Sequence, residues 1–125
     1  MHSKREDVPA VLKSGALYSR DVEWGDMNVA FKGFPAGTDS GPLFKGLPND
    51  SCQCPHWGYV IKGSMRVKYA DHEEVIAAGE AYHLPAGHNV VVDEDCEIVE
   101  FSPRDESQKT MVVAARNMKA MQGSG

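Results

Sequence analysis

Cysteine and histidine side chains gather at one point of the sequence, in the spacing Cys52-x-Cys54-x-His56. If this segment is extended, alternate residues point the same way, so two thiols and an imidazole share one face. Thiolate sulfur and imidazole nitrogen are the ligands that Zn²⁺ takes in tetrahedral sites, and three such ligands leave one position open. Soft sulfur ligands also favour zinc or copper over manganese. The spacing predicts a divalent metal site, with zinc expected first and iron or copper as the alternatives.

Each of these side chains also has a plainer interpretation. Free cysteine is among the most buried residue types, so Cys52 and Cys54 are alternatively small core residues. His56 is either a metal ligand, a catalytic acid or base, or a hydrogen-bonded interior histidine. The third cysteine, Cys96, lies between two acidic residues that oppose thiolate formation, which favours inert packing.

Two further histidines are candidates for the same site. His88 follows the turn Pro85-Ala86-Gly87 and is expected to be a fourth metal ligand; the alternative is a turn histidine bonded to the backbone. His83 is the candidate catalytic residue, as a proton carrier. Lys45 is available to bind an acidic substrate.

Short apolar segments separated by turn residues predict the elements that position these side chains. They lie at residues 22–31, 57–61, 65–69, 74–76, 81–84, 90–92 and 97–101. Strands at such short intervals indicate a sandwich or closed barrel. The Gly- and Pro-rich stretch from Gly33 to Ser51 predicts a long loop, suited to a lid. A methionine and alanine stripe at helical spacing predicts a C-terminal helix at residues 105–121.

The predicted organisation is therefore an irregular N-terminal arm at 1–20, a barrel at 21–104 and the helix at 105–121. Residues 122–125 are expected to form a flexible end. At 125 residues the chain has room for one domain.

Two sequence blocks resemble the conserved barrel of the cupin superfamily. The block from Cys52 to Gly63 is similar to the first cupin motif, and Gly79-x₅-Pro85-x-Gly87 is similar to the start of the second. The resemblance implies an all-β cupin fold, a double-stranded β-helix or jelly roll. The CPHWGYV stretch and the PxGH turn further resemble a group of small bacterial cupins.

The ligand positions of the two motifs differ from the family pattern. His56 stands where the family usually has glutamate, Cys52 stands at the second histidine, and Val90 stands at the last one. The usual site of three histidines and one glutamate is therefore replaced, and His88 is the residue expected to stand in for Val90.

Charge and hydropathy limit the partners. The net charge is −5 and no Lys/Arg stripe is present, so nucleic acid is not expected. The sequence contains no apolar run of membrane-spanning length and no signal-peptide core, which favours a cytoplasmic protein with no membrane partner. A homodimer is expected from the aromatic and methionine content.

Two functions are consistent with this sequence. The first is a metal-dependent enzyme of lyase, isomerase or dioxygenase type acting on a small organic molecule, as the family resemblance implies. The alternative is a non-catalytic sensor or accessory module that binds a metal or small ligand. Four protein ligands would favour the module, and three ligands with an open position would favour the enzyme. A third interpretation, a metal-free barrel that binds an apolar ligand, applies if the protein holds no metal.

Overall fold

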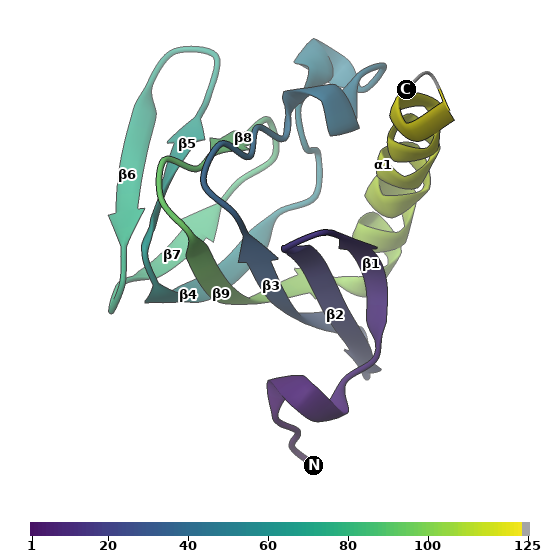
Figure 1. The fold of residues 1–125 in the computed structure, drawn as a ribbon, viewed down its shortest axis with the longest axis vertical. Helices are drawn as coiled ribbons and strands as arrows, with labels where there is room; N and C mark the ends of the chain where they lie inside the picture. Colours follow the sequence, from purple (N-terminus) through teal and green to yellow (C-terminus); the bar gives the residue numbers. More distant parts are fainter. Residues whose placement is uncertain (124–125) are drawn as a thin grey trace.

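A computed structural model describes residues 1–123 of the chain. Within that range the chain forms nine strands, three short 3₁₀ helices and one α-helix (Figure 1). The strands are β1 (Ala10–Ser14), β2 (Leu17–Trp24), β3 (Met27–Phe34), β4 (His56–Lys62), β5 (Ser64–Lys68), β6 (Glu73–Ala77), β7 (Ala81–Leu84), β8 (Asn89–Val91) and β9 (Cys96–Pro103). The helices are η1 (Arg5–Asp7), η2 (Gly41–Phe44), η3 (Pro48–Asp50) and α1 (Arg104–Gly123).

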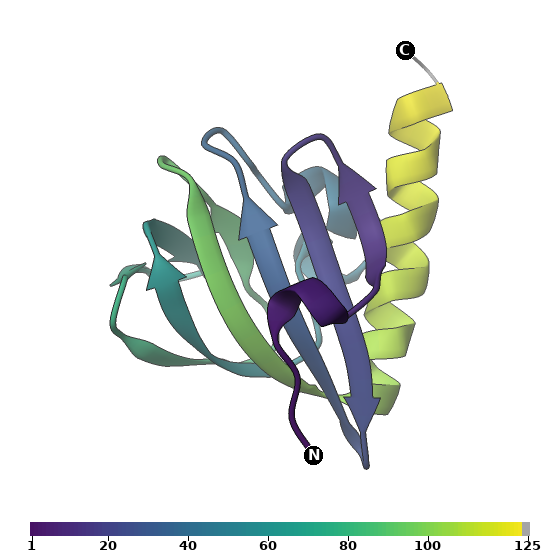
Figure 2. The ribbon, with the colours of Figure 1, turned by 60° about the horizontal axis from the view of Figure 1, so that its bottom comes forward.

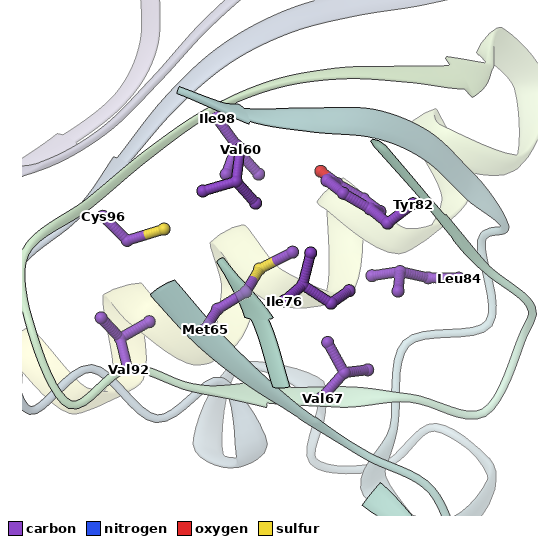
Figure 3. Close-up of a cluster of buried hydrophobic side chains, with 9 residues drawn as sticks. All are labelled: Val60, Met65, Val67, Ile76, Tyr82, Leu84, Val92, Cys96 and Ile98. Atoms are coloured by element: carbon purple, nitrogen blue, oxygen red, sulfur yellow. The ribbon is translucent and has the colours of Figure 1, made fainter. Parts of the chain in front are cut away.

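The strands form two sheets that enclose one core. The larger sheet has the order β1-β2-β3-β9-β4-β7, and the smaller one has the order β6-β5-β8. Every strand pair is antiparallel. Between the sheets lies a cluster of buried side chains from both: Val60, Met65, Val67, Ile76, Tyr82, Leu84, Val92, Cys96 and Ile98 (Figure 3).

Strand β9 shows how the sequence selects the inner face. Its residues alternate in burial, so Ile98, Glu100 and Ser102 face the interior while Phe101 faces outward. This is the period-two pattern of a strand with one buried face. Because β9 lies between β3 and β4, its inner residues occupy the middle of the larger sheet.

A glycine allows the tight passage from β4 to β5. Gly63 has a φ of 77°, and a Cβ added there would lie 2.0 Å from the carbonyl oxygen of Asp95. Only a residue without a side chain fits this close backbone approach.

Helix α1 lies beside the segment that contains η2 (Figures 1 and 2). The side-chain amide of Asn117 on α1 donates hydrogen bonds to the carbonyls of Leu43 and Lys45, at 2.8 and 2.9 Å. Thr110 and Ala114 are the buried residues of the helix, among those whose burial is described. The predicted C-terminal helix is confirmed, from Arg104 to Gly123.

The prediction of an irregular arm at residues 1–20 is wrong for residues 10–20, which form β1, a turn and the start of β2. Residues 1–9 precede the first strand, and η1 falls within them. Strand β1 and the start of β2 form an antiparallel hairpin that extends the larger sheet. Of the expected flexible end at 122–125, residues 122 and 123 belong to α1, and the last two lie outside the described residues. Along residues 1–123, no helix has the length and hydropathy to cross a membrane.

Candidate metal centre and ligand cavity

Backbone hydrogen bonds bring two distant segments together at the start of β4. The amide of Cys52 donates to the carbonyl of His88 at 2.8 Å, and the amide of Gly87 donates to the carbonyl of Cys52 at 2.7 Å. These hydrogen bonds place Cys52 and His88, which are 36 positions apart in sequence, side by side just before β4 begins at His56. The Gly87 turn therefore positions His88 next to the cysteine segment.

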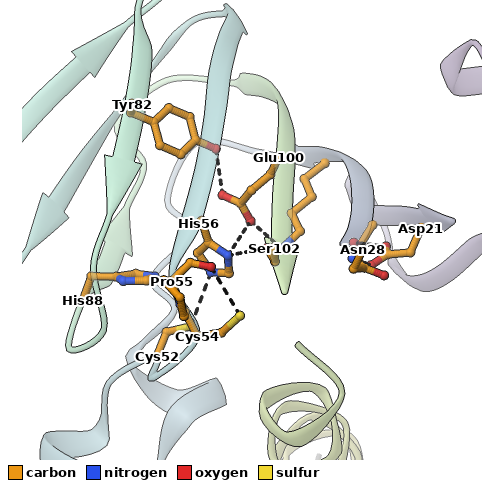
Figure 4. Close-up of polar contacts among 12 residues, drawn as sticks. Asp21, Asn28, Cys52, Cys54, Pro55, His56, Tyr82, His88, Glu100 and Ser102 are labelled. Atoms are coloured by element: carbon orange, nitrogen blue, oxygen red, sulfur yellow. Dashed lines mark hydrogen bonds and ion pairs between the residues drawn. The ribbon is translucent and has the colours of Figure 1, made fainter. Parts of the chain in front are cut away.

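Three donor atoms converge in the interior at this junction. The ligand atoms of Cys52, His56 and His88 all lie within 4.8 Å of one another. The Cys52 Sγ and His56 Nε2 atoms are 3.5 Å apart, and the two imidazole ring centroids are 5.0 Å apart. All three residues are buried (Figure 4).

The spacing of these donors fits a metal ion. Zinc–sulfur and zinc–nitrogen bonds of about 2.3 and 2.0–2.1 Å, at a tetrahedral angle, hold the sulfur and nitrogen atoms about 3.5 Å apart. The Sγ–Nε2 distance of 3.5 Å matches this value. One thiol and two imidazoles also form a ligand set that zinc, copper and iron accept.

Each imidazole is oriented by a bond at its other nitrogen. His88 Nδ1 lies 2.7 Å from the carbonyl oxygen of Pro85, which can only accept, so Nδ1 carries the proton and Nε2 has a free lone pair. His56 Nδ1 lies 2.6 Å from Ser102 Oγ and 3.5 Å from Glu100 Oε1. Metal-binding histidines are held in this way by oxygen acceptors at the second nitrogen.

Glu100 is the centre of a buried polar network. Its carboxylate accepts a hydrogen bond from the Tyr82 hydroxyl at 2.7 Å (Figure 4). It also pairs with the Lys32 ammonium at 3.0 Å. Burial by itself raises the pKa of Glu100, but charge interactions with His56, which is protonated only in acid, and with Lys32, together with the two hydrogen bonds, lower that pKa to about 2. Burial likewise opposes the charge of Lys32, yet Glu100 and Asp21 raise its pKa above the ordinary value. The two groups therefore form a buried ion pair.

Burial keeps the three candidate ligands neutral. It lowers the pKa of His56 to about 4, lowers the pKa of His88, and raises the pKa of the Cys52 thiol to about 11. Neutral imidazole is the form that binds a metal, and a thiol loses its proton when a metal binds it. The site thus presents two ready nitrogen ligands and one thiol that a cation would ionise.

Cys54 lies in the same cavity but outside the convergent group. Its Sγ donates to the carbonyl of Pro55 at 3.4 Å, and the residue is only 1 % exposed. Burial raises the pKa of this thiol to about 12. Of the four metal ligands predicted from the sequence, the structure brings Cys52, His56 and His88 together and leaves Cys54 in the wall beside them.

His83 does not reach the cavity. Strand β7 pairs it with Trp57 of β4 on the outer face of the sheet, where the two rings stack with centroids 4.9 Å apart. Tyr82 and Leu84 take the inward positions of that strand instead. The expected proton-carrier role of His83 in the site is therefore not supported by its position. Lys45, expected to meet an acidic substrate, is also exposed and outside the cavity lining.

Sequence reasoning missed the network on β9 and β3. Glu100, Ser102 and Lys32 are polar residues at inward positions, but polar residues occupy both faces of the segment from Glu97 to Phe101. The apolar neighbours Ile98 and Val99 also lie on opposite faces, so alternation alone did not identify the inner one. The signal available in the sequence was Glu100 itself, a charged residue between two apolar residues of a predicted strand.

A cavity of about 110 Å³ is lined in part by the three donors. Its polar lining includes Cys52, His56, His88 and Glu100, and the part of the wall that α1 and η2 contribute is called its roof. Most of its remaining wall is apolar, including Leu12, Leu17, Phe34, Leu43, Phe44 and Met111. The candidate metal centre therefore opens toward an apolar space.

Comparisons with known proteins identify the fold. No family model and no curated protein sequence matches the chain. Among solved structures, an RmlC-like cupin from Shewanella frigidimarina has a TM-score of 0.60 at 15% identity, over 82% of this chain and 88% of that one. The polyketide cyclase RemF from Streptomyces resistomycificus has a TM-score of 0.62 at 18% identity, over 83% of this chain and 79% of that one.

Oxalate decarboxylase from Bacillus subtilis has a TM-score of 0.60 at 17% identity. The match covers 79% of this chain and 28% of that longer one. At these identities the likeness concerns the fold alone. The chain has the all-β cupin fold, a jelly-roll barrel with a C-terminal α-helix, as its Gly and Pro framework predicted.

Proposed function

We propose that the protein is a metal-dependent cupin enzyme acting on a small organic molecule, with the metal held by Cys52, His56 and His88. The observation that carries the proposal is the convergence of these three buried donors in the wall of one cavity. Three protein ligands leave a coordination position for water or substrate, which is the arrangement of catalytic sites.

Zinc is the metal that this donor set favours. Sulfur ligation disfavours hard cations such as magnesium and manganese, and the Sγ–Nε2 distance of 3.5 Å suits tetrahedral zinc. Iron and copper are the alternatives. When bound, the metal would supply Lewis-acid polarisation of a substrate oxygen, or a bound water with a lowered pKa.

The chain's own residues have distinct parts in this proposal. Pro85 and Ser102 hold the two imidazoles so that each Nε2 faces the metal position. Glu100 lies 3.5 Å from His56 Nδ1, the ring nitrogen that does not face the metal position, and its negative charge balances the positive charge of Lys32. The apolar wall and helix α1 restrict the access of water to the cavity.

Elemental analysis of the purified protein tests the metal assignment. We expect about one equivalent of metal in the natural sequence, a loss of metal in Cys52→Ser, His56→Ala and His88→Ala, and no loss in Cys96→Ser. Cys96 is a matched control because it is equally buried, in the core beside Val92 rather than in the site. Retention of stoichiometric metal by both Cys52→Ser and His56→Ala would reject the ligand assignment.

The second candidate is a non-catalytic module with a closed metal site. The buried position of Cys54 in the lining of the same cavity favours it, because a fourth protein ligand from that lining would close the site. The variant Cys54→Ser discriminates between the two functions. Metal retained at unchanged affinity indicates the open, three-ligand site, and loss of metal indicates the closed one.

A further inference from the structure

We propose that the cavity accepts a compact organic ligand with an apolar body and a single oxygen head group carrying at most one negative charge. This inference rests on the proposed metal site and goes further by naming the class of molecule that binds there. The wall, the charges and the size of the cavity support it.

Most of the residues that line the cavity are apolar. Leu12, Leu17, Phe34 and Leu43 belong to this apolar majority, and the charged or metal-binding side chains are the three donors, Lys32 and Glu100. Each methylene that a ligand buries against such a wall contributes about 0.8 kcal/mol to its binding free energy. The hydroxyls of Ser19, Thr38 and Ser40 also line the space, but each already donates to a protein acceptor. A second polar group on the ligand would therefore find few partners, which is costly, so we expect the polar head at one end only.

The charges of the site fix the charge of the head group. Lys32 is the only Lys or Arg among the described residues that line the cavity, and Glu100 already pairs with it at 3.0 Å. A divalent metal with one thiolate and two neutral imidazoles has a net charge of +1. One negative charge on the ligand is therefore balanced, whereas a second would be buried without a cation.

The cavity volume limits the body of the ligand. The space measures about 110 Å³, and an engineered apolar cavity of ~150 Å³ binds benzene. A single six-membered ring therefore fills the space, and a fused double ring would extend beyond it. Phenol combines this body with one oxygen that ionises once, so it is a suitable probe.

The test uses the full chain loaded with Co²⁺, whose visible spectrum reports changes in coordination. Calorimetry measures the affinities of phenol, phenyl phosphate and 1-naphthol. We expect phenol to bind at least about tenfold more tightly than either of the others and to shift the cobalt spectrum. Equal or tighter binding of phenyl phosphate would overturn the charge argument, and equal binding of 1-naphthol would overturn the size argument.

A pair of neighbouring substitutions tests whether phenol occupies this cavity. Met111 lines the cavity, and the next residue on the same helix, Val112, is 68% exposed. Met111→Glu places a carboxylate in the apolar wall and is expected to weaken phenol binding about tenfold or more, while Val112→Glu leaves it unchanged. Equal effects of the two substitutions would place phenol elsewhere.

The outcomes also separate this inference from the proposed function. If cobalt binds but phenol does not, the ligand class is wrong and the metal site stands. Phenol binding with an unchanged cobalt spectrum contradicts the placement of the oxygen at the metal. If cobalt does not bind, the metal proposal fails, and phenol binding to the metal-free protein then decides whether the apolar cavity accepts this class.

Discussion

His56 depends on Ser102 for the orientation of its ring. The two residues are 46 positions apart in sequence, yet Ser102 Oγ lies 2.6 Å from His56 Nδ1 because β9 pairs with β4. Glu100 Oε1 lies 3.5 Å from the same nitrogen and is a second partner. This contact directs Nε2 toward Cys52, so the geometry of the proposed ligand is fixed by a residue that need not touch the metal.

We predict that Ser102→Ala weakens metal binding by about tenfold, since loss of a group that orients a ligand typically costs 10–100-fold in affinity. Competition with a chromophoric chelator measures the change. Ser64→Ala is the control, because the Ser64 hydroxyl donates to Glu94 far from the site. Equal affinities in the two variants would show that Ser102 does not position His56.

Tyr82 is predicted to stabilise the fold through Glu100. Its hydroxyl donates to Oε2 at 2.7 Å in the interior, so Tyr82→Phe leaves a buried acceptor without this donor. Such a loss costs about 1–3 kcal/mol of unfolding free energy. Urea denaturation measures the effect, with the 45% exposed Tyr59 as the control position. If Tyr59→Phe and Tyr82→Phe have equal stability, the hydrogen bond contributes nothing.

Whether a strand or helix could be predicted from the sequence depended on whether one of its faces is buried. Strand β5 buries one face, so its apolar residues Met65 and Val67 alternate visibly with polar ones. Strand β1 has no buried residue among its five, because it is an edge strand, and the hairpin it forms was therefore not predicted. Helix α1 was predicted because its alanine and methionine stripe has the period of a helix packed on one side.

The sequence predicted those residues of the candidate site that lie within short, recognisable segments of the chain. Cys52 and His56 lie in one short segment, and the PxGH turn drew attention to His88. Contacts such as Lys32 with Glu100 join residues 68 positions apart, so they depend on the strand order β3-β9-β4, which short-range patterns do not specify. The facing of His83 depends in the same way on its pairing with Trp57.

The turn from β4 to β5 is predicted to tolerate no side chain at Gly63. A Cβ there would meet the Asp95 carbonyl oxygen at 2.0 Å, whereas Gly79 has a similar positive φ with nothing within 4 Å. Gly79→Ala is therefore expected to lose about 1–2 kcal/mol from backbone strain alone. Gly63→Ala adds a backbone clash and is expected to lose about 4 kcal/mol or more. Thermal and urea unfolding of both variants measure the difference, and equal losses would contradict it.

Asn117 is predicted to hold the roof of the cavity closed. Its amide bonds to the carbonyls of Leu43 and Lys45 join α1 to η2. Asn117→Ala should increase amide hydrogen exchange in residues 41–47, since each lost bond is worth about 0.5–1.5 kcal/mol. Lys119→Ala, at an exposed position of the same helix, is the control. Unchanged exchange in Asn117→Ala would show that packing alone holds the roof.

For the molecule as a whole, the outer face of the larger sheet carries apolar side chains that nothing in the described chain covers. Trp57, Tyr59, Ile61 and Phe101 are 37–50% exposed there. The N-terminal segment covers only the neighbouring part of this face, where Arg5 pairs with Glu97 at 2.7 Å. An apolar patch of this kind on one face is typical of an interaction site.

We propose that a second copy of the chain packs on this face, since a patch without charge at its centre can pair with itself about a two-fold axis. Sedimentation velocity is expected to show a dimer that Ile61→Lys converts to a monomer. Val75→Lys is the matched control, because Val75 is 63% exposed on β6 of the other sheet. The metal content of Ile61→Lys should be unchanged, because the three donors lie on the opposite, inner side of the sheet. A natural protein that sediments as a monomer, or equal behaviour of the two lysine variants, would remove this face as the interface.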